Sequence, residues 1–596
     1  MPFHRLPTSV LCGSVHSSRG FLAPLRSALA AARRLRGARC QRESGACRSQ
    51  GRQVTHPTAH PRTLDDDFGF GSSSPEPIVA TPGANALSEV EDDLYMHKFL
   101  REKQKEKQSV QIPLVDEDSF DTQYPDAEQP SSSGSGCPVY VMLPLDTVWV
   151  VEREEKRISV LKKERSLDIA LHTLKQAGVE GVMVDVWWGI VERAGPRQYD
   201  FNAYKRLFQK VAGAGLKVQA VMSFHAAGGN VGDTCKIPLP KWILDIGEHN
   251  LDIYYTDKAG HRNKECLSLG CDDVPLFWGR TPVQMYRDFI DAFADMFQEL
   301  FGSVITEVTV GLGPAGELRY PSYPEGDGRW RFPGVGEFQC YDKYMLECLR
   351  RAAEAAGHPE WGRSGPHDAG HYNSSIWDSG FFNSNTGSWN TAYGEFFLSW
   401  YSDMLLKHAD RVLTVAAEVL NKHGRPRVFR SMRDASNGHV IYEFAPACKM
   451  GIKLAGVHWW FKSRSHAAEL TAGYYNTRER NGYLPFMAML RQHDASLSFT
   501  CVEMRDCEHP PEGRCSPQQL LQQVIESAEA YGVPLSGENA LQRYDDYAFD
   551  RIAESAFGRS ARAGRLTQVT FLRMGDLMFD NWDAFSRFLN RMRNKA

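Results

Sequence analysis

The chain has 596 residues, 42% of them hydrophobic and 24% charged, and a formal net charge of -4. This composition is typical of a globular protein. The near-neutral charge argues against a nucleic-acid or anionic-membrane partner. The lack of any apolar run of about 18 residues excludes a membrane-spanning helix. The 13 cysteines are too sparse for a disulfide scaffold and show neither a CxxC pair nor zinc-ligand spacing, so we expect no metal site.

The N-terminal segment, residues 1–50, is strongly basic. Eight arginines precede the first acidic residue, Glu43, and Ser, Ala and Leu fill the spaces between them. Such a composition predicts an organellar transit peptide, which is removed from the mature protein. A disordered basic tail and a nuclear signal around Arg33–Arg39 are the alternatives.

Residues 51–136 have little apolar periodicity and are rich in Asp, Ser, Pro and Gly, as in Ser131–Gly136. Such a segment cannot bury enough apolar surface to offset its chain entropy, so we expect a disordered linker. One short charged helix near Asp92–Lys107 is expected to interrupt it.

Residues 137–596 alternate between apolar, β-branched runs and amphipathic stretches. Leu167–Ala177, Tyr204–Ala214 and Val283–Phe301 have the periodicity of helices. Alternating β and α units predict a parallel sheet, and eight of them favour a single (β/α)8 TIM barrel with long loops over two Rossmann-like domains. The eight expected strands are Val139–Pro144, Gly181–Val186, Lys217–Phe224, Thr306–Gly311, Ile452–Trp459, Leu497–Val502, Val533–Gly537 and Thr567–Leu572.

A polar residue stands at or near the end of every expected strand. Each one alone has an ordinary explanation, such as a helix cap or a buried structural histidine, but a barrel gathers its strand ends at one mouth. Together they predict an active site, and the aromatic groups Trp187-Trp188, Trp459-Trp460 and Tyr320 beside them suit a sugar ring, although packing explains about half of them equally well. The strand-end residues are Asp146, Asp185, His225, Glu317, His458, Thr500 with Glu503, Glu538 and Arg573.

Six motifs in this part of the chain resemble those of plant β-amylase, in the same order. The resemblance implies a glycoside hydrolase that releases β-maltose from the non-reducing ends of starch-type α-1,4-glucans with inversion. Together with the expected transit peptide, it predicts a chloroplast protein. It implies no cofactor. The motifs are Val141–Asp146, Gly181–Gly189, Gly311–Pro321, Gly456–Trp460, Phe499–Asp506 and Gly537–Leu541.

The resemblance also assigns roles to single residues. It implies that Glu317 is the general acid and Glu538 the general base, and that Asp233 is the carboxylate of a mobile lid in the glycine-rich segment Gly228–Asp233. Inversion needs two carboxyl groups about 6.5–9.5 Å apart, with room for a water, and strands four and seven lie on opposite sides of an eight-stranded ring. The implied substrate contacts are Asp185, His225, Lys453, His458, Thr500, Asn539, Ala540 and Arg573.

The chain departs from the family pattern at three places: at Ala226-Ala227 after His225, in an apparent insertion at 425–449, and at Met574-Gly575-Asp576 after Arg573. A catalytically weak glucan-binding or regulatory member of the family is therefore the alternative function, and a nuclear DNA-binding regulator is a second one. A GxGxxG pattern at Gly311–Gly316 resembles a dinucleotide fingerprint, but a breaker run follows it where that motif needs a helix.

Overall fold

The computed structural model describes residues 136–153, 156–230, 232–423, 427–433, 440–446, 448–558 and 566–594. The expected transit peptide (1–50), the helix expected near Asp92–Lys107 and all but the last residue of the expected linker (51–136) lie outside these ranges. No helix within the described ranges is long and apolar enough to cross a membrane.

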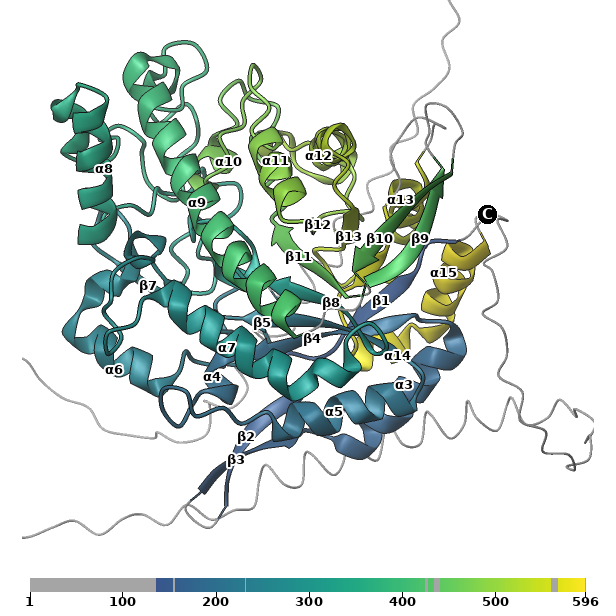
Figure 1. Ribbon diagram of the computed structural model, residues 1–596. Helices are drawn as coiled ribbons and strands as arrows, with labels where there is room; N and C mark the ends of the chain where they lie inside the picture. The colour runs from purple at the N-terminus through teal and green to yellow at the C-terminus, as the bar shows by residue number, and fades with distance from the viewer. Residues whose placement is uncertain are drawn as a thin grey trace, which may run out of the picture. The chain divides into compact units, whose positions relative to one another are not determined.

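Eight parallel strands close into a barrel, with helices around the outside (Figure 1). The strands follow one another around the barrel in the order β1-β14-β13-β12-β11-β8-β5-β4. This arrangement confirms the expected (β/α)8 barrel. The strands are β1 Val139–Met142, β4 Gly181–Trp187, β5 Lys217–Ser223, β8 Ile305–Val310, β11 Lys449–Leu454, β12 Ala495–Phe499, β13 Leu535–Glu538 and β14 Val569–Phe571.

Each barrel strand overlaps its expected run, but the fifth run is misplaced. The expected strand Ile452–Trp459 begins three residues too late, and its second half is loop, because β11 ends at Leu454. The apolar residues beyond it are buried for another reason: Trp459 donates its indole N–H to the carbonyl of Gly334, 3.0 Å away in another loop. Lys453 is consequently the penultimate residue of β11 and not an early one.

The helices include all three expected amphipathic stretches, which lie in α3, α5 and α7 with its short 3-10 extension, η3 (Gln298–Leu300). α7 begins with a reciprocal capping box between Thr281 and Gln284 and has Pro282 at its first position, a combination that satisfies N–H groups and fixes the helix start. The helices are α3 Glu164–Ala177, α4 Trp188–Val191, α5 Asn202–Gly213, α6 Lys241–His249, α7 Pro282–Phe297, α8 Lys343–Ala355, α9 Ala392–Lys422, α10 Ala467–Ala472, α11 Leu484–Gln492, α12 Pro517–Tyr531, α13 Asp546–Phe557, α14 Asp576–Asp580 and α15 Trp582–Asn594.

Three antiparallel hairpins lie outside the barrel sheet, and the sequence did not predict them. Lys156–Leu161, Arg262–Leu267 and Arg427–Arg433 carry two or three charged residues each, and Tyr254–Thr256 is only three residues long, so the apolar alternation that identifies a strand is weak in these segments. The third hairpin occupies much of the apparent insertion at 425–449. The pairs are β2 Val148–Arg153 with β3 Lys156–Leu161, β6 Tyr254–Thr256 with β7 Arg262–Leu267, and β9 Arg427–Arg433 with β10 Val440–Pro446.

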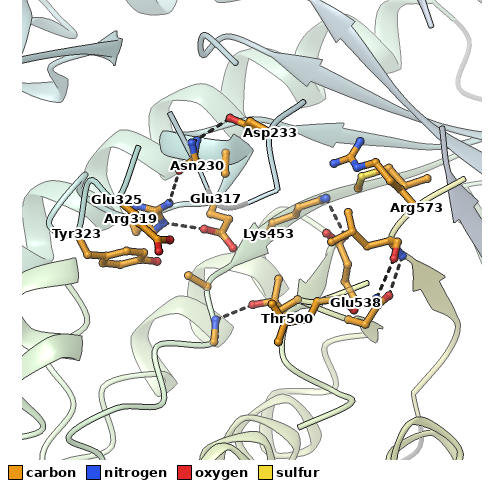
Figure 2. Close-up of a pocket in the computed structure, with 18 of the residues that line it drawn as sticks. Asn230, Asp233, Glu317, Arg319, Tyr323, Glu325, Lys453, Thr500, Glu538 and Arg573 are labelled. Atoms are coloured by element: carbon orange, nitrogen blue, oxygen red, sulfur yellow. Dashed lines mark hydrogen bonds and ion pairs between the residues drawn. The ribbon is translucent and has the colours of Figure 1, made fainter. Parts of the chain in front are cut away.

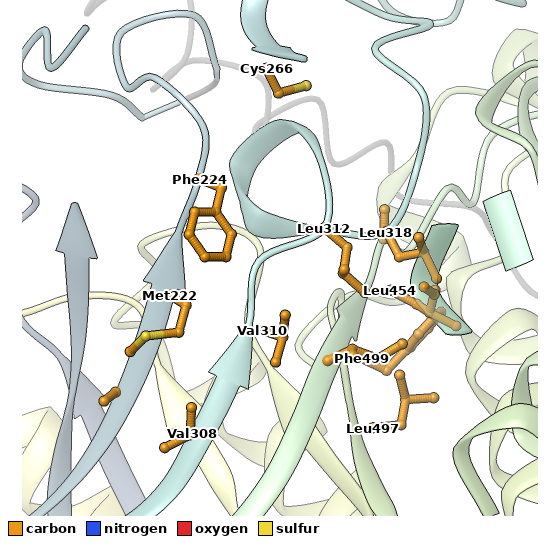
Figure 3. Packing of buried hydrophobic residues seen from close by; sticks show 14 of the residues in the cluster. Met222, Phe224, Cys266, Val308, Val310, Leu312, Leu318, Leu454, Leu497 and Phe499 are labelled. Carbon is orange, nitrogen blue, oxygen red and sulfur yellow. The ribbon is translucent and has the colours of Figure 1, made fainter. Parts of the chain in front are cut away.

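Alternate strand residues form two apolar layers. Side chains such as Met222, Val310 and Phe499 belong to the large cluster between strands and helices (Figure 3). Met183 and Val221 belong instead to a small separate cluster with Met142. This alternation follows from the two-residue repeat of a strand, and it leaves the barrel interior free to hold polar groups.

A buried carboxylate, Glu307 of β8, organises part of that interior. One of its oxygens accepts hydrogen bonds from the side-chain amides of Gln219 and Gln568 at 3.1 and 2.6 Å, and the other accepts from the Ser496 hydroxyl at 3.2 Å. Gly451 leaves the space they need, since a Cβ there would lie 2.8 Å from a Glu307 oxygen. Burying a charge is costly unless such donors surround it, so the network fixes the relative positions of the strands below the site.

Candidate active site

A pocket of about 350 Å³ opens at the carboxyl ends of the barrel strands. The eleven residues that the sequence analysis assigned to the site all line this pocket, although they come from strand ends and loops spread over nearly 400 residues. They are Asp185, His225, Asp233, Glu317, Lys453, His458, Thr500, Glu538, Asn539, Ala540 and Arg573.

Two of the strand-end polar residues do not line the pocket. Asp146 forms an ion pair with Lys162 at 2.8 Å and lines an adjoining pocket together with Arg573, so it lies beside this pocket and not in it. Glu503 lies under the loop after β13, where its carboxylate accepts the backbone N–H groups of Ala540 and Leu541 at 3.0 and 2.8 Å. Burial raises the pKa of Glu503 to about 7. Its contacts make Glu503 a positioning residue for the pocket wall.

Glu538 is the last residue of β13, and its carboxylate is paired with Lys453 from β11 (Figure 2). The Lys453 Nζ lies 2.7 Å from a Glu538 oxygen, and only 5% and 8% of the two side chains are exposed. A buried ion pair of this kind holds both groups in a defined orientation, because separating them would leave an uncompensated charge.

Glu317 follows a single 3-10 turn, η4 (Pro314–Gly316), beyond β8. Its backbone pairs with that of Lys453 as an isolated parallel bridge, and Leu318 donates its N–H to the Lys453 carbonyl at 2.8 Å. Lys453 therefore contacts both glutamates, the first through its backbone and the second through its side chain.

Arg319 is a site residue that the sequence analysis did not assign. Its Nε lies 2.6 Å from a Glu317 oxygen, and its guanidinium stacks 4.3 Å above the centre of the Tyr323 ring. Both residues line the pocket. The signal that could have revealed Arg319 is its position two residues after the expected acid, inside a motif that was already recognised.

Arg319 also connects Glu317 to the glycine-rich loop through a chain of polar contacts. A second guanidinium nitrogen of Arg319 lies 3.4 Å from the side-chain oxygen of Asn230. The side-chain nitrogen of Asn230 donates a hydrogen bond to Glu265 at 2.7 Å. The same Glu265 oxygen accepts the backbone N–H of Ala315 at 2.8 Å. Glu265 thus ties the loop to the turn that precedes Glu317, and burial raises its pKa.

Asp233 is held by its own loop. One carboxylate oxygen accepts the backbone N–H groups of Gly228, Gly229 and Asn230 at 2.7, 3.0 and 3.0 Å. Gly228 has a φ of 114°, a conformation that glycine adopts at low cost. The Asp233 carboxylate therefore lies at the edge of the pocket. A rearrangement of the loop would have to break its three hydrogen bonds to the loop backbone.

The two histidines of the pocket are neutral at neutral pH. Burial lowers the pKa of His225 to about 4, although nearby Asp185 and Asp233 oppose the shift, and burial lowers the pKa of His458 to about 3. The His225 ring also makes an edge contact with Trp187, with 5.1 Å between ring centroids. A neutral imidazole has one donor and one acceptor, which suits a sugar hydroxyl.

Asn539 and Thr500 use their side chains to hold the surrounding loops together. The Asn539 amide donates to the carbonyls of Leu541 and Leu572 at 2.8 and 3.0 Å, and its oxygen accepts the Leu572 N–H at 2.7 Å. The Thr500 hydroxyl accepts the Gly456 N–H at 2.7 Å. These bonds shape the pocket wall from which both residues face a ligand.

The aromatic residues divide between the pocket and the core, as the sequence analysis anticipated. Trp187 and Trp459 line the pocket, whereas Trp188 and Tyr320 are wholly buried. Tyr320 stacks on Tyr401 with 3.8 Å between the ring centroids. Three aromatic residues that the sequence analysis did not assign also line the pocket: Tyr323, Trp330 and Phe332.

The GxGxxG pattern at Gly311–Gly316 is not a dinucleotide site. Only the one-turn η4 follows β8, and the next helix, α8, begins at Lys343. A phosphate-binding fingerprint needs a helix N-terminus directly after the glycines, and the structure has none there.

Comparison with known proteins identifies the family. The sequence model of glycosyl hydrolase family 14 matches residues 140–596. The chain is 51% identical over 472 residues to beta-amylase 2, chloroplastic, of Oryza sativa subsp. japonica, and the match covers 79% of each chain. It is 45% identical to the beta-amylase of Glycine max, and that match covers 76% of this chain and 86% of the relative. The crystal structure of the catalytic domain of the Paenibacillus polymyxa beta-amylase matches with a TM-score of 0.58 at 30% identity, covering 77% of this chain and 98% of that chain. The chain belongs to glycosyl hydrolase family 14, the β-amylases.

Proposed function

We propose that this protein releases β-maltose from the non-reducing ends of α-1,4-glucans with inversion, with Glu317 as general acid and Glu538 as general base. The observation that carries the proposal is that these two carboxyl groups, from β13 and from the turn after β8, line one pocket together with the expected sugar contacts. The catalytic unit would comprise residues 137–596.

In the proposed reaction, the Glu317 carboxyl group gives its proton to the glycosidic oxygen as the bond from that oxygen to the anomeric carbon breaks. The Glu538 carboxylate takes a proton from a water molecule, whose oxygen attacks the anomeric carbon from the opposite face. The α-linkage is thereby converted into a β-configured maltose. Exchange with solvent then returns both carboxyl groups to their starting protonation states.

The loop Gly228–Asp233 acts as a lid in this proposal. Closure would exclude water from the reacting groups and bring the Asp233 carboxylate to the sugar. Asn230 contacts Arg319, and Arg319 pairs with Glu317, so movement of the loop would change the surroundings of the general acid at the same time.

The remaining pocket residues would bind the sugar rings. His225, His458 and Asp185 offer hydrogen-bonding groups, the aromatic faces of Trp187 and Trp459 offer apolar contact, and the exposed Leu541 at the rim would contact the glucan chain. Starch or maltooligosaccharides are the substrates that fit such a lining.

A maltose-release assay on soluble starch tests the function, with wild type, Glu317→Gln and Glu529→Gln measured side by side. Glu529 is an exposed residue of α12, so it controls for the loss of a negative charge. We expect maltose from the wild type and the Glu529 variant and none from the Glu317 variant. A wild type that binds starch but releases no maltose would instead establish the glucan-binding, regulatory alternative.

We also propose that residues 1–50 direct the chain to the chloroplast, as their composition predicts. Two of the relatives from Oryza sativa subsp. japonica are named chloroplastic. Incubation of the full chain with isolated chloroplasts should produce a shortened, protease-protected form, and an uncut chain outside the organelle would contradict the proposal.

A further inference from the structure

Three potential metal ligands converge beside the pocket, and the reaction does not use two of them. His458 follows β11, His509 follows the 3-10 turn η7 (Asp506–Glu508), and Cys515 precedes α12. A ring nitrogen of each histidine and the Cys515 sulfur all lie within 4.8 Å of one another. The two imidazole rings have 4.4 Å between their centroids.

Each of the two histidines has a buried ring nitrogen without a partner. Within the part of the chain that the structure describes, His458 Nδ1 and His509 Nε2 have no hydrogen-bond partner. A buried polar atom that is left unsatisfied costs about 1–3 kcal/mol, so two of them on rings whose centroids lie 4.4 Å apart favour the binding of a ligand there.

The backbone around the three residues is already fixed in place. Ser516 donates its N–H to the His458 carbonyl at 3.0 Å, and Trp460 and Lys462 donate theirs to the carbonyls of Gly513 and Arg514 at 2.7 and 2.9 Å. The segment after β11 and the segment before α12 are therefore joined next to the three side chains. A preorganised set of ligands loses little entropy when an ion binds.

We propose that His458, His509 and Cys515 bind a divalent transition-metal ion such as Zn²⁺. Imidazole nitrogen and thiolate sulfur are the ligands that Zn²⁺ prefers, whereas Mg²⁺ and Ca²⁺ require oxygen. Three protein ligands leave the fourth tetrahedral position for water or another small ligand. The sequence analysis expected no metal site, because His458 lies far along the chain from the other two residues and no local spacing connects them.

Metal binding needs neutral imidazole rings and a thiolate, so the two histidines can bind as they are, whereas Cys515 must lose a proton. Burial lowers the pKa of His458 to about 3 and also lowers the pKa of His509, so both rings have a free lone pair at neutral pH. Burial raises the pKa of Cys515 to about 12, so the thiol is protonated in the metal-free chain. Binding forms a sulfur–metal bond and releases the thiol proton to water.

The site connects metal binding to the pocket through His458, which lines it. With two neutral imidazoles and one thiolate, a bound Zn²⁺ adds one net positive charge and fixes the His458 ring. We expect the ion to inhibit glucan hydrolysis for this reason. This expectation of inhibition, unlike metal binding itself, rests on the proposed function.

Cobalt(II) is the probe for binding, because a Co²⁺–thiolate bond gives a near-ultraviolet charge-transfer band. The full chain, freed of metal, is titrated with Co²⁺ as wild type, Cys515→Ser, His509→Gln and Cys507→Ser. Cys507 is an exposed cysteine in the same segment, so it is the matched control. We expect one Co²⁺ per chain with the band in wild type and in Cys507→Ser.

The charge-transfer band should be absent from Cys515→Ser. The His509→Gln variant should bind Co²⁺ at least about tenfold more weakly than wild type, because the loss even of a residue that only hydrogen-bonds to a metal ligand costs about 10–100-fold in metal affinity. Near-ultraviolet circular dichroism checks that each variant is folded. A wild type without the band, or a Cys515→Ser variant that keeps it, would overturn the site.

Inhibition is measured separately, with Zn²⁺ added during maltose release from starch. His509 does not line the pocket, so His509→Gln should have wild-type activity without metal and need at least about tenfold more Zn²⁺ for the same inhibition. Equal sensitivity of the two proteins would overturn the connection to the pocket. Inactivity of both proteins without metal would refute the proposed function but leave the cobalt result intact.

Discussion

The ammonium group of Lys453 lies 2.7 Å from a carboxylate oxygen of Glu538, and both side chains are almost wholly buried. The backbone of the same lysine pairs with that of Glu317. One residue of β11 therefore sets the positions of both carboxyl groups to which we assign the reaction. Because a buried ion pair is strongly destabilised when one partner is removed, the orientation of Glu538 depends on Lys453 as much as on β13.

The roles of Glu317 and Glu538 can be separated with a substrate whose leaving group needs no proton, such as maltosyl fluoride. On maltopentaose, Glu317→Gln and Glu538→Gln should each lower kcat by about 100-fold or more, because acid–base catalysis contributes roughly 10²–10⁴-fold. On maltosyl fluoride, Glu317→Gln should recover most of the wild-type rate and Glu538→Gln should not. Recovery by the Glu538 variant alone would reverse the assignment.

Replacement of Asp233 by Asn should lower kcat much more than it weakens the binding of maltopentaose. Contacts made only in the closed, transition-state-like form affect kcat, whereas contacts present throughout affect KM alone. Steady-state kinetics would measure the split, with Asp295→Asn on the exposed face of α7 as the matched control. An unchanged kcat in the Asp233 variant would show that this carboxylate has no part in turnover.

Glu503 should make the protein less stable as the pH rises from about 4.5 to about 7. Burial raises the pKa of Glu503 from 4.5 to about 7, so in this window the folded chain binds more protons at this site than the unfolded chain does. The contribution of Glu503 to stability is complete below pH 4.5 and is lost as the pH rises to the folded-state pKa, at a cost of up to about 3 kcal/mol.

The comparison with Glu503→Gln isolates this effect. A glutamine oxygen can still accept the N–H groups of Ala540 and Leu541, but it does not titrate. Urea unfolding at several pH values should give a free energy of unfolding that falls less steeply with pH in the variant than in wild type. Parallel curves would show that Glu503 ionises normally in the folded protein.

The sequence predicted the barrel because eight apolar runs mark its strands, and it misplaced the fifth run where apolar residues are buried for another reason. Trp459 extended the fifth run into a loop, since its burial comes from contact with the loop around Gly334. The three hairpins escaped prediction because one strand or the other of each hairpin is very short or carries several charged residues and so lacks a regular apolar pattern.

The eleven assigned residues line one pocket because each follows a strand or belongs to a recognised motif, and their roles stay predictions. Asn230 and Glu265 were missed because their contacts with Arg319 and with the turn before Glu317 join segments that are distant in the sequence. The same limit applies to His509 and Cys515. Arg319 was overlooked although it lies only two residues after Glu317 in a recognised motif. Asp146 lies beside the pocket and not in it, and its strand-end position does not reveal that Lys162 pairs with its side chain.

The configuration of the first product tests the central claim most directly. Proton NMR of the early reaction with maltopentaose distinguishes the two anomers of maltose before they interconvert. In the proposed mechanism, Glu538 activates a water molecule that attacks from the face opposite the leaving group. We therefore expect β-maltose to appear first and the α-anomer to appear only later. Early α-maltose would mean that configuration is retained, and it would contradict the assignment of Glu538 as a general base.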